Sequence, residues 1–540
     1  MTTTVSPARS RTGSRSASSH LTGTGAMVRL ALRRDRIKLT IWLVAITALV
    51  PRFYYAAVTS VVPTPEALAE ASQMIRVSFM RVLGGPLFGD VTTRSYFLAA
   101  YWVEFLLAAA IMNMMLITRH TRAEEQTGRA ELIRAAVVGR HAQLTAALIV
   151  ALISNAALAI LTTAATISIG FPVGSALLFG VSLAAAGLVF AGVTAVTAQV
   201  TEHPRGANGL AGVVLIAVWL LRGAGAMQSQ EGGPLFWLSP IGWSQQTRVL
   251  ADERWWPLGL SVLLAGLLVA GAYSLASRRD LGASLMAPRP GRASAPSWLR
   301  SPFALALRLQ QAAIVGWGAA FVAIGFVLGA MTGGMANTDL PIFSGADFGR
   351  AWLSLMVFTG SLYTGVFAVL SVIRLRTEEV RGRIGPVLAG PTGRSTWFWS
   401  SLLVTALAVV VLPAVYGAAL GIGAAVSTGD PGLAGEVIWA SLRRTPEVLV
   451  LLAVPAALLG LAPRAMSVSW AVVVYSGFMQ ILGPYMQVPG WLVNTSVLSH
   501  LPWHPLGAFA PVATVVLTAL AAALMFLGLY GLRRRDLASG

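Results

Sequence analysis

The chain has 540 residues, of which 56% are hydrophobic and only 11% are charged, and its mean hydropathy is +0.71. Soluble domains have about 25% charged residues, so a soluble fold of this length could not bury so much apolar surface and the surrounding solvent must be lipid. The net charge of +18 would suggest nucleic acid in a soluble protein, but the basic residues lie between apolar spans, so no nucleic-acid partner is expected. There is no cysteine, which excludes disulfides, thiolate metal sites and cysteine nucleophiles.

The N-terminal region contains two different segments. Residues 1–25 are rich in Ser, Thr, Gly and Arg, without acids or an apolar run, so we expect a disordered cytoplasmic tail and not a signal peptide. In residues 27–38, MVRLALRRDRIK, three arginines fall on one helical face and apolar side chains on the other. This pattern predicts a short basic amphipathic helix that lies in the headgroup plane.

Membrane-spanning helices need about 20 apolar residues each, and twelve segments meet this requirement. They are 39–60, 95–118, 142–168, 174–198, 208–227, 257–277, 311–332, 349–373, 396–426, 445–462, 467–485 and 511–532. The segments 119–140, 278–300, 374–394 and 533–535 are dense in arginine, so we expect them on the cytoplasmic side. Twelve spans with both termini in the cytoplasm satisfy this charge pattern.

The second half of the chain repeats the first. Five pairs of segments match in register: Leu30–Arg33 with Leu305–Arg308, Thr121–Arg129 with Leu375–Arg383, Gly139-Arg140 with Gly393-Arg394, Pro204-Arg205 with Pro463-Arg464, and Arg278–Leu281 with Arg534–Leu537. The offset falls from 275 (305 − 30) to 254 (378 − 124) between the first two pairs, which indicates a shorter outer loop in the second copy. Six spans per copy give both copies one orientation, as in parallel repeats. We therefore expect transmembrane halves at 26–281 and 301–540, joined by a cytoplasmic linker at 282–300.

The repeated charged segment after the second span of each half is the strongest functional signal. Glu125 and Arg129 are four residues apart, as are Glu379 and Arg383, in the Glu-first order that supports a helix. A charged helix that occurs twice on the cytoplasmic face predicts a docking site for a two-fold partner. The alternative is a solvated loop that only enforces topology.

Four features together are similar to those of a known family: the basic helix 27–38, the EExxGR segments at Glu124–Arg129 and Glu378–Arg383, the segment Leu238–Trp243, and the RRDL that closes each half. The arrangement resembles ABC-2-type exporter permeases, in particular the actinobacterial polyketide-antibiotic (tetronasin-type) and multidrug ABC transporter permeases. The resemblance covers nearly the whole chain and implies an all-α polytopic protein of the bacterial plasma membrane, with a type V (ABC-2-like) exporter fold of twelve transmembrane helices.

The resemblance also implies where the partner binds. The helix 27–38 and its counterpart near 302–310 would be elbow helices, and the EExxGR segments would be coupling helices seated in two copies of an ABC ATPase. Segments 228–256 and 486–510 would form short outer helices. The coupling residues would be Arg122, Glu124, Glu125, Gly128, Arg129, Glu131, Arg376, Glu378, Glu379, Gly382 and Arg383. Gly385-Pro386 would shorten the second coupling helix, so the two ATPase contacts would not be equivalent.

This chain is not expected to bind ATP or any other cofactor itself. A Walker A loop needs G-x-x-x-x-G-K-[ST], and the one lysine, Lys38, follows Arg36 and Ile37. ATP and Mg²⁺ would therefore be bound by the partner ATPase, and the chain alone would not be an enzyme.

Polar residues inside predicted spans are candidates for the substrate path. Glu104 and Arg222 could form an ion pair with each other, or Glu104 could face the path and meet cationic substrates. Asn113 and the neighbouring Met112 could line an adaptable apolar surface, or simply pack between helices. Arg443, Arg444 and Glu447 are expected to be interfacial anchors at the start of the tenth span.

The resemblance implies export of amphipathic antibiotic or drug-like molecules, powered by the partner ATPase. A proton-coupled transporter of the major-facilitator type is the alternative, although its Asp-Arg-x-Gly-Arg loop core is missing. A membrane-embedded enzyme is disfavoured because no Ser/His/Asp or His/Glu constellation is present. No metal site is expected, since Pro502 interrupts the helix that would align His500 with His504.

Overall fold

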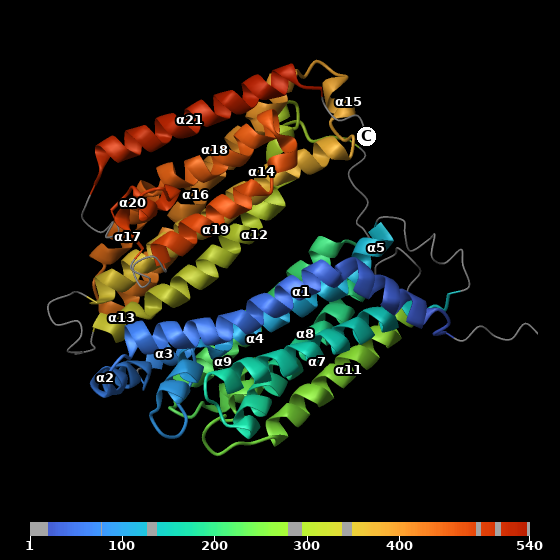
Figure 1. Ribbon diagram of the computed structural model, residues 1–540. Helices are drawn as coiled ribbons and strands as arrows, with labels where there is room; N and C mark the ends of the chain where they lie inside the picture. Colours follow the sequence, from blue (N-terminus) through green and yellow to red (C-terminus); the bar gives the residue numbers. More distant parts are fainter. Residues whose placement is uncertain are drawn as a thin grey trace, which may run out of the picture. The chain divides into compact units, whose positions relative to one another are not determined.

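The computed structural model describes residues 20–76, 78–126, 138–278, 294–336, 348–481, 488–502 and 509–536. These described segments consist of helices joined by turns and loops, and none of them contains a strand. The chain divides into two compact units, Met1–Pro290 and Gly291–Gly540 (Figure 1). The division falls inside the predicted linker 282–300.

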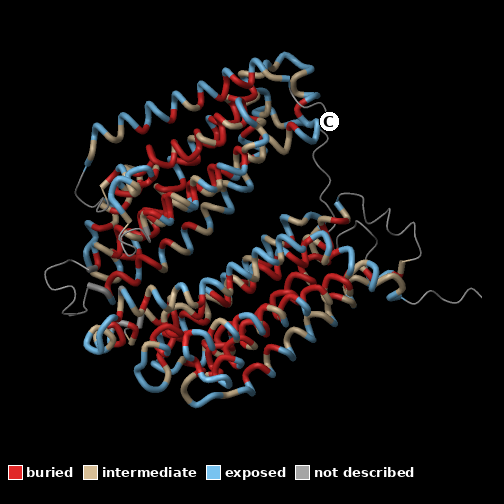
Figure 2. Tube along the Cα trace, in the orientation of Figure 1, coloured by how far each residue is buried: buried red, intermediate tan, exposed pale blue. Residues whose placement is uncertain are grey.

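Unit 1 contains six of the long apolar helices in the described part of the chain. Its elements are α1 (Thr24–Ala56), η1 (Ala57–Val61), α2 (Pro65–Arg76), α3 (Ser78–Leu83), α4 (Thr93–His120), α5 (Arg122–Gln126), α7 (Ala142–Ser168), α8 (Val173–Val200), α9 (Pro204–Gln228), η2 (Pro234–Leu238), α10 (Pro240–Gln245) and α11 (Trp256–Ser277). Helix α8 is apolar on all sides and is the most enclosed of the six (Figure 2), as expected for a helix without a polar face.

Unit 2 has the same general construction. Its elements are α12 (Pro302–Ala330), α13 (Thr332–Ala336), α14 (Phe348–Val380), α15 (Gly385–Leu388), α16 (Arg394–Thr428), α17 (Gly432–Arg443), α18 (Thr445–Leu461), η4 (Pro463–Ala465), α19 (Val468–Ile481), α20 (Gly490–Val493), η5 (Val497–Ser499) and α21 (Pro511–Arg534). Glycines allow its helices to approach closely. A Cβ atom on Gly329 would collide with the α16 backbone, and one on Gly460 would collide with α21.

Eleven helices of the described chain are long and apolar enough to cross a membrane. They coincide with eleven of the twelve predicted spans, which confirms a polytopic all-α membrane protein. The remaining predicted span, 467–485, overlaps α19, which is apolar but has only 14 residues. Residues 482–487 lie outside the described part, so the span 467–485, and with it the total of twelve spans, stays a prediction.

The expected elbow helix is not a separate element. The basic segment 27–38 forms the first turns of α1, which continues without a break to Ala56. The segment near 302–310 likewise begins α12. Residues 26–50 contain neither Gly nor Pro, so nothing in the sequence interrupts the helix where the charged part meets the apolar part.

The loops on the opposite side hold the predicted short helices. Elements η2 and α10 lie within 228–256, and α20 and η5 lie within 486–510. The long loop between α1 and α4 of unit 1 contains α2 and α3, which have no equivalent among the described residues of unit 2.

Candidate functional site

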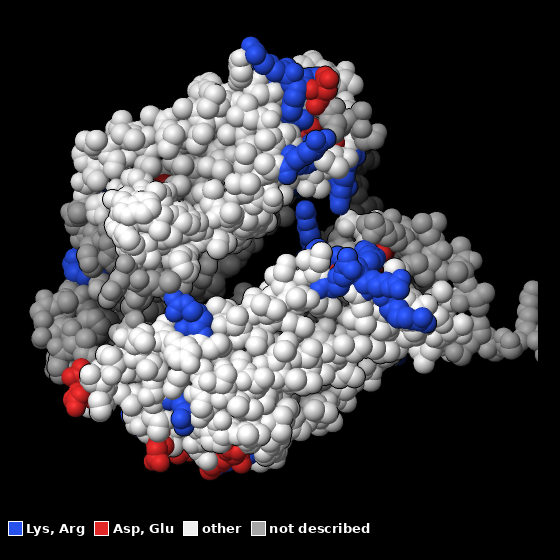
Figure 3. All heavy atoms as spheres, in the orientation of Figure 1, with Lys and Arg blue, Asp and Glu red and all other residues white. Residues whose placement is uncertain are grey.

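Basic side chains gather at one end of each unit. Figure 3 shows them over α1 near α5 in unit 1, and over the ends of α14 and α21 in unit 2, whereas acidic side chains gather at the opposite end of unit 1. Such a distribution is typical of a membrane protein whose arginine-rich end faces the cytoplasm. The predicted coupling segments lie at these basic ends.

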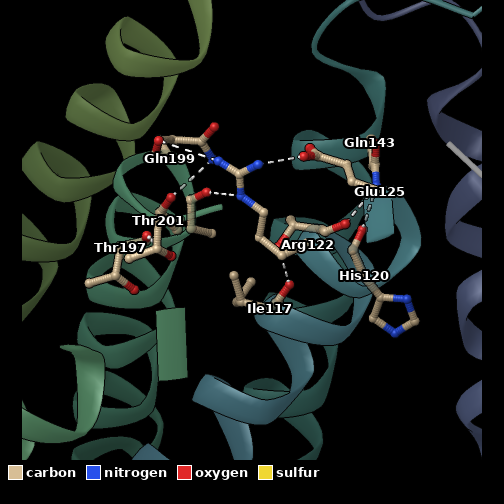
Figure 4. Close-up of polar contacts among 11 residues, drawn as sticks. Ile117, His120, Arg122, Glu125, Gln143, Thr197, Gln199 and Thr201 are labelled. Atoms are coloured by element: carbon tan, nitrogen blue, oxygen red, sulfur yellow. Dashed lines mark hydrogen bonds and ion pairs between the residues drawn. The ribbon is translucent and has the colours of Figure 1, made fainter. Parts of the chain in front are cut away.

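Arg122 fastens the coupling segment of unit 1 to the neighbouring helix. Its side chain is fully buried, and its guanidinium donates to the carbonyl oxygens of Ala198 and Gln199 at the end of α8 (Figure 4). It also pairs with Glu125, with 2.7 Å between Nη1 and Oε2. A cation near the C-terminal carbonyls of a helix is favourable, so Arg122 holds α5 against α8.

The basic segment of α1 is tied to the same region by ion pairs. Glu124 Oε1 lies 2.7 Å from Arg34 Nη1. Asp35 is 3% exposed, and its carboxylate lies 2.8 Å from Arg119 Nη2 and 2.8 Å from His120 Nε2. The start of α1 and the α4–α5 segment therefore form one charged junction.

Unit 2 builds the equivalent junction at the end of α14. The Glu379 carboxylate is buried and accepts two hydrogen bonds from Arg535, at 2.5 and 2.7 Å. Glu379 also pairs with Arg376 at 3.0 Å, and Glu378 pairs with Arg374 at 3.0 Å. Because Arg535 directly follows α21, these contacts hold the coupling segment of unit 2 against the last helix.

Several of these contacts recur at register-matched positions. The pair Arg122–Glu125 of unit 1 corresponds to Arg376–Glu379 of unit 2, both three residues apart. The matched arginines of the two Gly-Arg segments also make equivalent contacts. Arg140 donates to Ser277 O at 2.7 Å, and Arg394 donates to Arg535 O at 2.9 Å. Each arginine thus binds backbone carbonyls at the end of the last helix of its own unit.

A pocket occupies the same place in both units, between the first helix, the coupling segment and the third long helix. Four of the matched lining positions are Leu30 and Leu305, Ala31 and Ala306, Glu124 and Glu378, and Gln143 and Trp397. In unit 2 the pocket has a volume of about 260 Å³ and extends to Arg383. The pocket of unit 1 is much smaller, about 30 Å³, so the two junctions match in the register of their lining residues but not in the size of the pocket.

Gly382 ends the predicted coupling helix of unit 2. Its φ is +67°, a conformation that glycine adopts without strain. The amide of Gly382 donates to Glu379 O at 2.9 Å and that of Arg383 to Glu378 O at 3.0 Å, which is the hydrogen-bond pattern of a Schellman motif. The helix break therefore comes from Gly382, and the expectation that Gly385-Pro386 causes it is wrong. Pro386 instead lies in the first turn of α15, where proline is tolerated.

Replacing Gly382 with alanine is expected to destabilise this turn by about 1–2 kcal/mol, because a side chain disfavours the left-handed conformation. Amides of residues 378–388 should then exchange with solvent about 5–30 times faster, as measured by hydrogen-exchange mass spectrometry. Gly385→Ala is the matched control, since Gly385 has no atom within 4 Å of an added Cβ and no positive φ. Equal exchange rates in the two variants would contradict the assignment.

The described coupling residues fall into three groups, of which Glu125, Arg376 and Glu378 form the partly buried one. Arg122, Glu124 and Glu379 are buried in contacts within their own unit, so they shape the junction. Gly382 and Arg383 are exposed, as is the neighbouring Arg381, so these residues form the surface that a partner could reach. Gly128, Arg129 and Glu131 lie outside the described residues.

The comparisons with known proteins agree with this architecture. Residues 25–275 and 299–533 match the family model described as "Multidrug efflux system permease Rv1217c, C-terminal domain". The chain is also 35% identical over 530 residues, 96% of each chain, to the multidrug efflux system permease protein Rv1217c of Mycobacterium tuberculosis (strain ATCC 25618 / H37Rv). This chain belongs to that family of multidrug efflux permeases. The resemblance found in the sequence is thus confirmed, and the chain is a multi-pass membrane permease.

The predicted substrate-path residues of this permease have different environments. Arg222 is fully buried and donates to the carbonyls of Val82 and Gly84 and to Gln245 Oε1. Glu104 is exposed on α4, and no ion pair joins it to Arg222. The expected Glu104–Arg222 pair is therefore not a direct contact within 4 Å, although the two charges attract each other at longer range. Arg222 instead binds the end of α3.

Asn113 and Met112 also differ from each other. Asn113 is fully buried and exchanges two hydrogen bonds with Asn155, at 3.1 and 2.7 Å. Gly187 packs against both amides, because an added Cβ would collide with them. Asn113 thus joins α4 to α7 in the core of unit 1. Met112 lines a pocket between α1, α4 and α9.

Unit 2 contains a buried ion pair that the sequence patterns did not indicate. Arg444 and Glu447 are 1% and 0% exposed and lie 2.9 Å apart, so the expectation that they are interfacial anchors is wrong. Arg444 also donates to Leu498 O at 3.2 Å, and its guanidinium lies over the ring of Phe358. The signal that could have located this site is Pro446, which interrupts the α17–α18 segment where unit 1 has the unbroken α8.

The described residues contain no group of three or more His, Asp or Glu side chains that could hold a metal ion. His500 is exposed, and His504 lies outside the described part.

Proposed function

We propose that this chain is the membrane-spanning subunit of an ATP-driven ABC exporter that moves amphipathic antibiotic or drug-like molecules out of the bacterial cell. In this proposal the chain holds twelve spans as two parallel repeats, both termini lie in the cytoplasm, and a separate ABC ATPase supplies the energy in two copies. The observation that carries the proposal is the duplicated charged junction, with its matched ion pairs and its matched pocket in both units. A partner with two-fold symmetry would find one such junction on each half.

The junction suits the transmission of a mechanical signal. The coupling segment of unit 1 is fixed to α1 and α8 by buried charges, and that of unit 2 is fixed to α21. Movement of a bound ATPase would therefore shift helices and not only a loop, since buried ion pairs resist separation. ATP and Mg²⁺ would be held by that partner, and this chain would position it.

The alternative, a proton-coupled transporter of the major-facilitator type, finds less support. A proton relay needs several carboxylates inside the membrane. Of the acids in the described membrane-spanning helices, Asp35, Glu124, Glu379 and Glu447 are engaged in ion pairs. Glu104 alone is exposed in the middle of its helix. In the exporter it would face the transport path.

The test is to tag the chain, solubilise it gently from its native host and identify the proteins that copurify. Wild type should bring down an ABC ATPase at two copies per chain. Arg381→Glu with Arg383→Glu should reduce this to about one copy, because only the exposed surface of unit 2 is reversed in charge. Glu379 is unsuitable for this test, since its replacement would disrupt the internal contacts with Arg535.

The matched control is Arg33→Glu with Arg308→Glu, which reverses two exposed charges near the start of α1 and α12. It should leave two copies bound. If no ATPase copurifies from wild type under conditions that preserve known ABC complexes, the exporter proposal fails and the gradient-driven alternative replaces it. If both double variants lose ATPase equally, the contact is general charge attraction and the Arg381–Arg383 surface is not the docking site.

A further inference from the structure

Unit 1 contains a second pocket that has no charged counterpart in unit 2. It has a volume of about 250 Å³ and lies between α1, α4 and α9. Asp35, Lys38 and Arg119 line one end, and Trp42 and Met112 line the other. The unit 2 residues in register with the three charged residues are Gln310, Ala313 and Ile373. The pocket therefore does not belong to the features that recur in both units.

The charge that this pocket offers to a ligand is positive. Asp35 is buried, is neutralised by Arg119 and is hydrogen-bonded to His120, each 2.8 Å away. Lys38 is exposed and forms no ion pair with any described residue. Glu104, the exposed acid of α4, precedes Arg119 by 15 residues, which is roughly 22 Å along a helix. No acid within the pocket thus remains available to a cationic ligand.

The uncharged residues that line the pocket are suited to contact the part of a ligand next to its head group. The Thr118 hydroxyl donates to Asn208 Oδ1 at 2.6 Å, so the amide nitrogen of Asn208 keeps its hydrogens for another acceptor. Met112, Met115 and Leu116 form the apolar wall of α4, and methionine side chains adapt to ligands of varied shape. The charged end lies at the basic end of unit 1 and the apolar end lies farther along the span.

We propose that this pocket binds the head of an anionic amphiphile, with its phosphate or carboxylate at Lys38 and its adjoining apolar part against Trp42 and Met112. Lysine binds such anions as a compact point charge. Pockets that enclose a whole drug-sized molecule have about 300–1,000 Å³, so this smaller pocket holds only the head and the adjacent segment. The amphiphile is either a phospholipid of the surrounding bilayer or a transported molecule, and only the second source rests on the proposed function.

The first arm of the test measures lipid preference. The full chain is placed in phosphatidylcholine vesicles with spin-labelled phosphatidylglycerol or spin-labelled phosphatidylcholine of the same acyl chains. Electron paramagnetic resonance then gives the immobilised fraction of each label. Wild type should prefer phosphatidylglycerol about five-fold, the effect of one lysine near an anionic head group. Lys38→Gln should remove the preference, and Lys38→Arg should retain it.

The second arm measures binding of a free amphiphile. Fluorescence of 11-dansylaminoundecanoate and of its methyl ester is followed in phosphatidylcholine nanodiscs, so that the two probes differ only in the carboxylate charge. A wild-type preference for the acid that disappears in Lys38→Gln supports a transported anion as the occupant. Preference in the lipid arm alone assigns the pocket to a phospholipid, and preference in both arms means that the site accepts either molecule.

Arg33→Gln is the matched control for both arms, because Arg33 is an exposed cation of α1 outside the pocket. It should leave both preferences unchanged. The proposal is overturned if wild type prefers neither anionic probe, or if Arg33→Gln weakens binding as much as Lys38→Gln does. Neither arm contains an ATPase, so a failure here leaves the exporter proposal untouched, and a failure of ATPase copurification leaves the lipid arm valid.

Discussion

Replacing Arg444 with leucine is expected to destabilise unit 2 by about 3–5 kcal/mol, since it leaves a buried charge without its partner. The Glu447 carboxylate is fully buried 2.9 Å from Arg444, and its remaining contact is the amide of Leu501 at 3.2 Å. The same change removes the donor to Leu498 O. The loss should be measured as a shift of the SDS-induced unfolding curve of the purified permease, followed by circular dichroism.

Two further variants isolate the cause. Arg443→Leu is the matched control, because it removes a neighbouring cation that is only partly buried, and it should cost much less. Arg444→Leu combined with Glu447→Leu should be more stable than Arg444→Leu alone, because replacing both members of a buried ion pair is often close to neutral. If the double variant is no more stable than the single one, the unpaired carboxylate is not the reason for the loss.

Replacing Arg122 with alanine is expected to cost about 3 kcal/mol, whereas the register-matched Arg376→Ala should cost about 1 kcal/mol or less. The two arginines make the same ion pair in the two units, but their surroundings differ. Arg122 has 0% of its side chain exposed and also holds the end of α8, while Arg376 is 24% exposed. The comparison thus measures the combined effect of burial and of the α8 contacts, again by SDS-induced unfolding.

The same two variants should also differ in transport. Arg122→Ala should also reduce drug efflux in cells more than Arg376→Ala does, because α5 would no longer be fixed to α8. Arg122→Lys keeps the charge but loses the forked geometry, so it should recover only part of the stability. Equal losses for Arg122→Ala and Arg376→Ala would show that burial does not distinguish the two junctions.

The sequence by itself determined the class of this protein. The apolar composition required lipid as solvent, and the length of each apolar run located eleven helices that the structure also contains. The efflux-permease family inferred from EExxGR, RRDL and the basic segment was confirmed by the comparisons. These features depend only on local sequence. The periodicity of an apolar segment and the sign of the charges beside it are the same whichever helices become neighbours.

Only the tertiary structure decided what the polar residues do. Glu104, Arg222, Asn113 and Arg444 all lie in or next to predicted spans, yet one is exposed, one binds the end of α3, one joins two helices and one forms a buried ion pair. The same holds for the coupling segment, where Glu379 is buried by Arg535 from a helix more than 150 residues away in the chain. A charged residue in lipid must find a partner, but which partner it finds depends on helix packing, and the sequence pattern of a single helix does not contain that information.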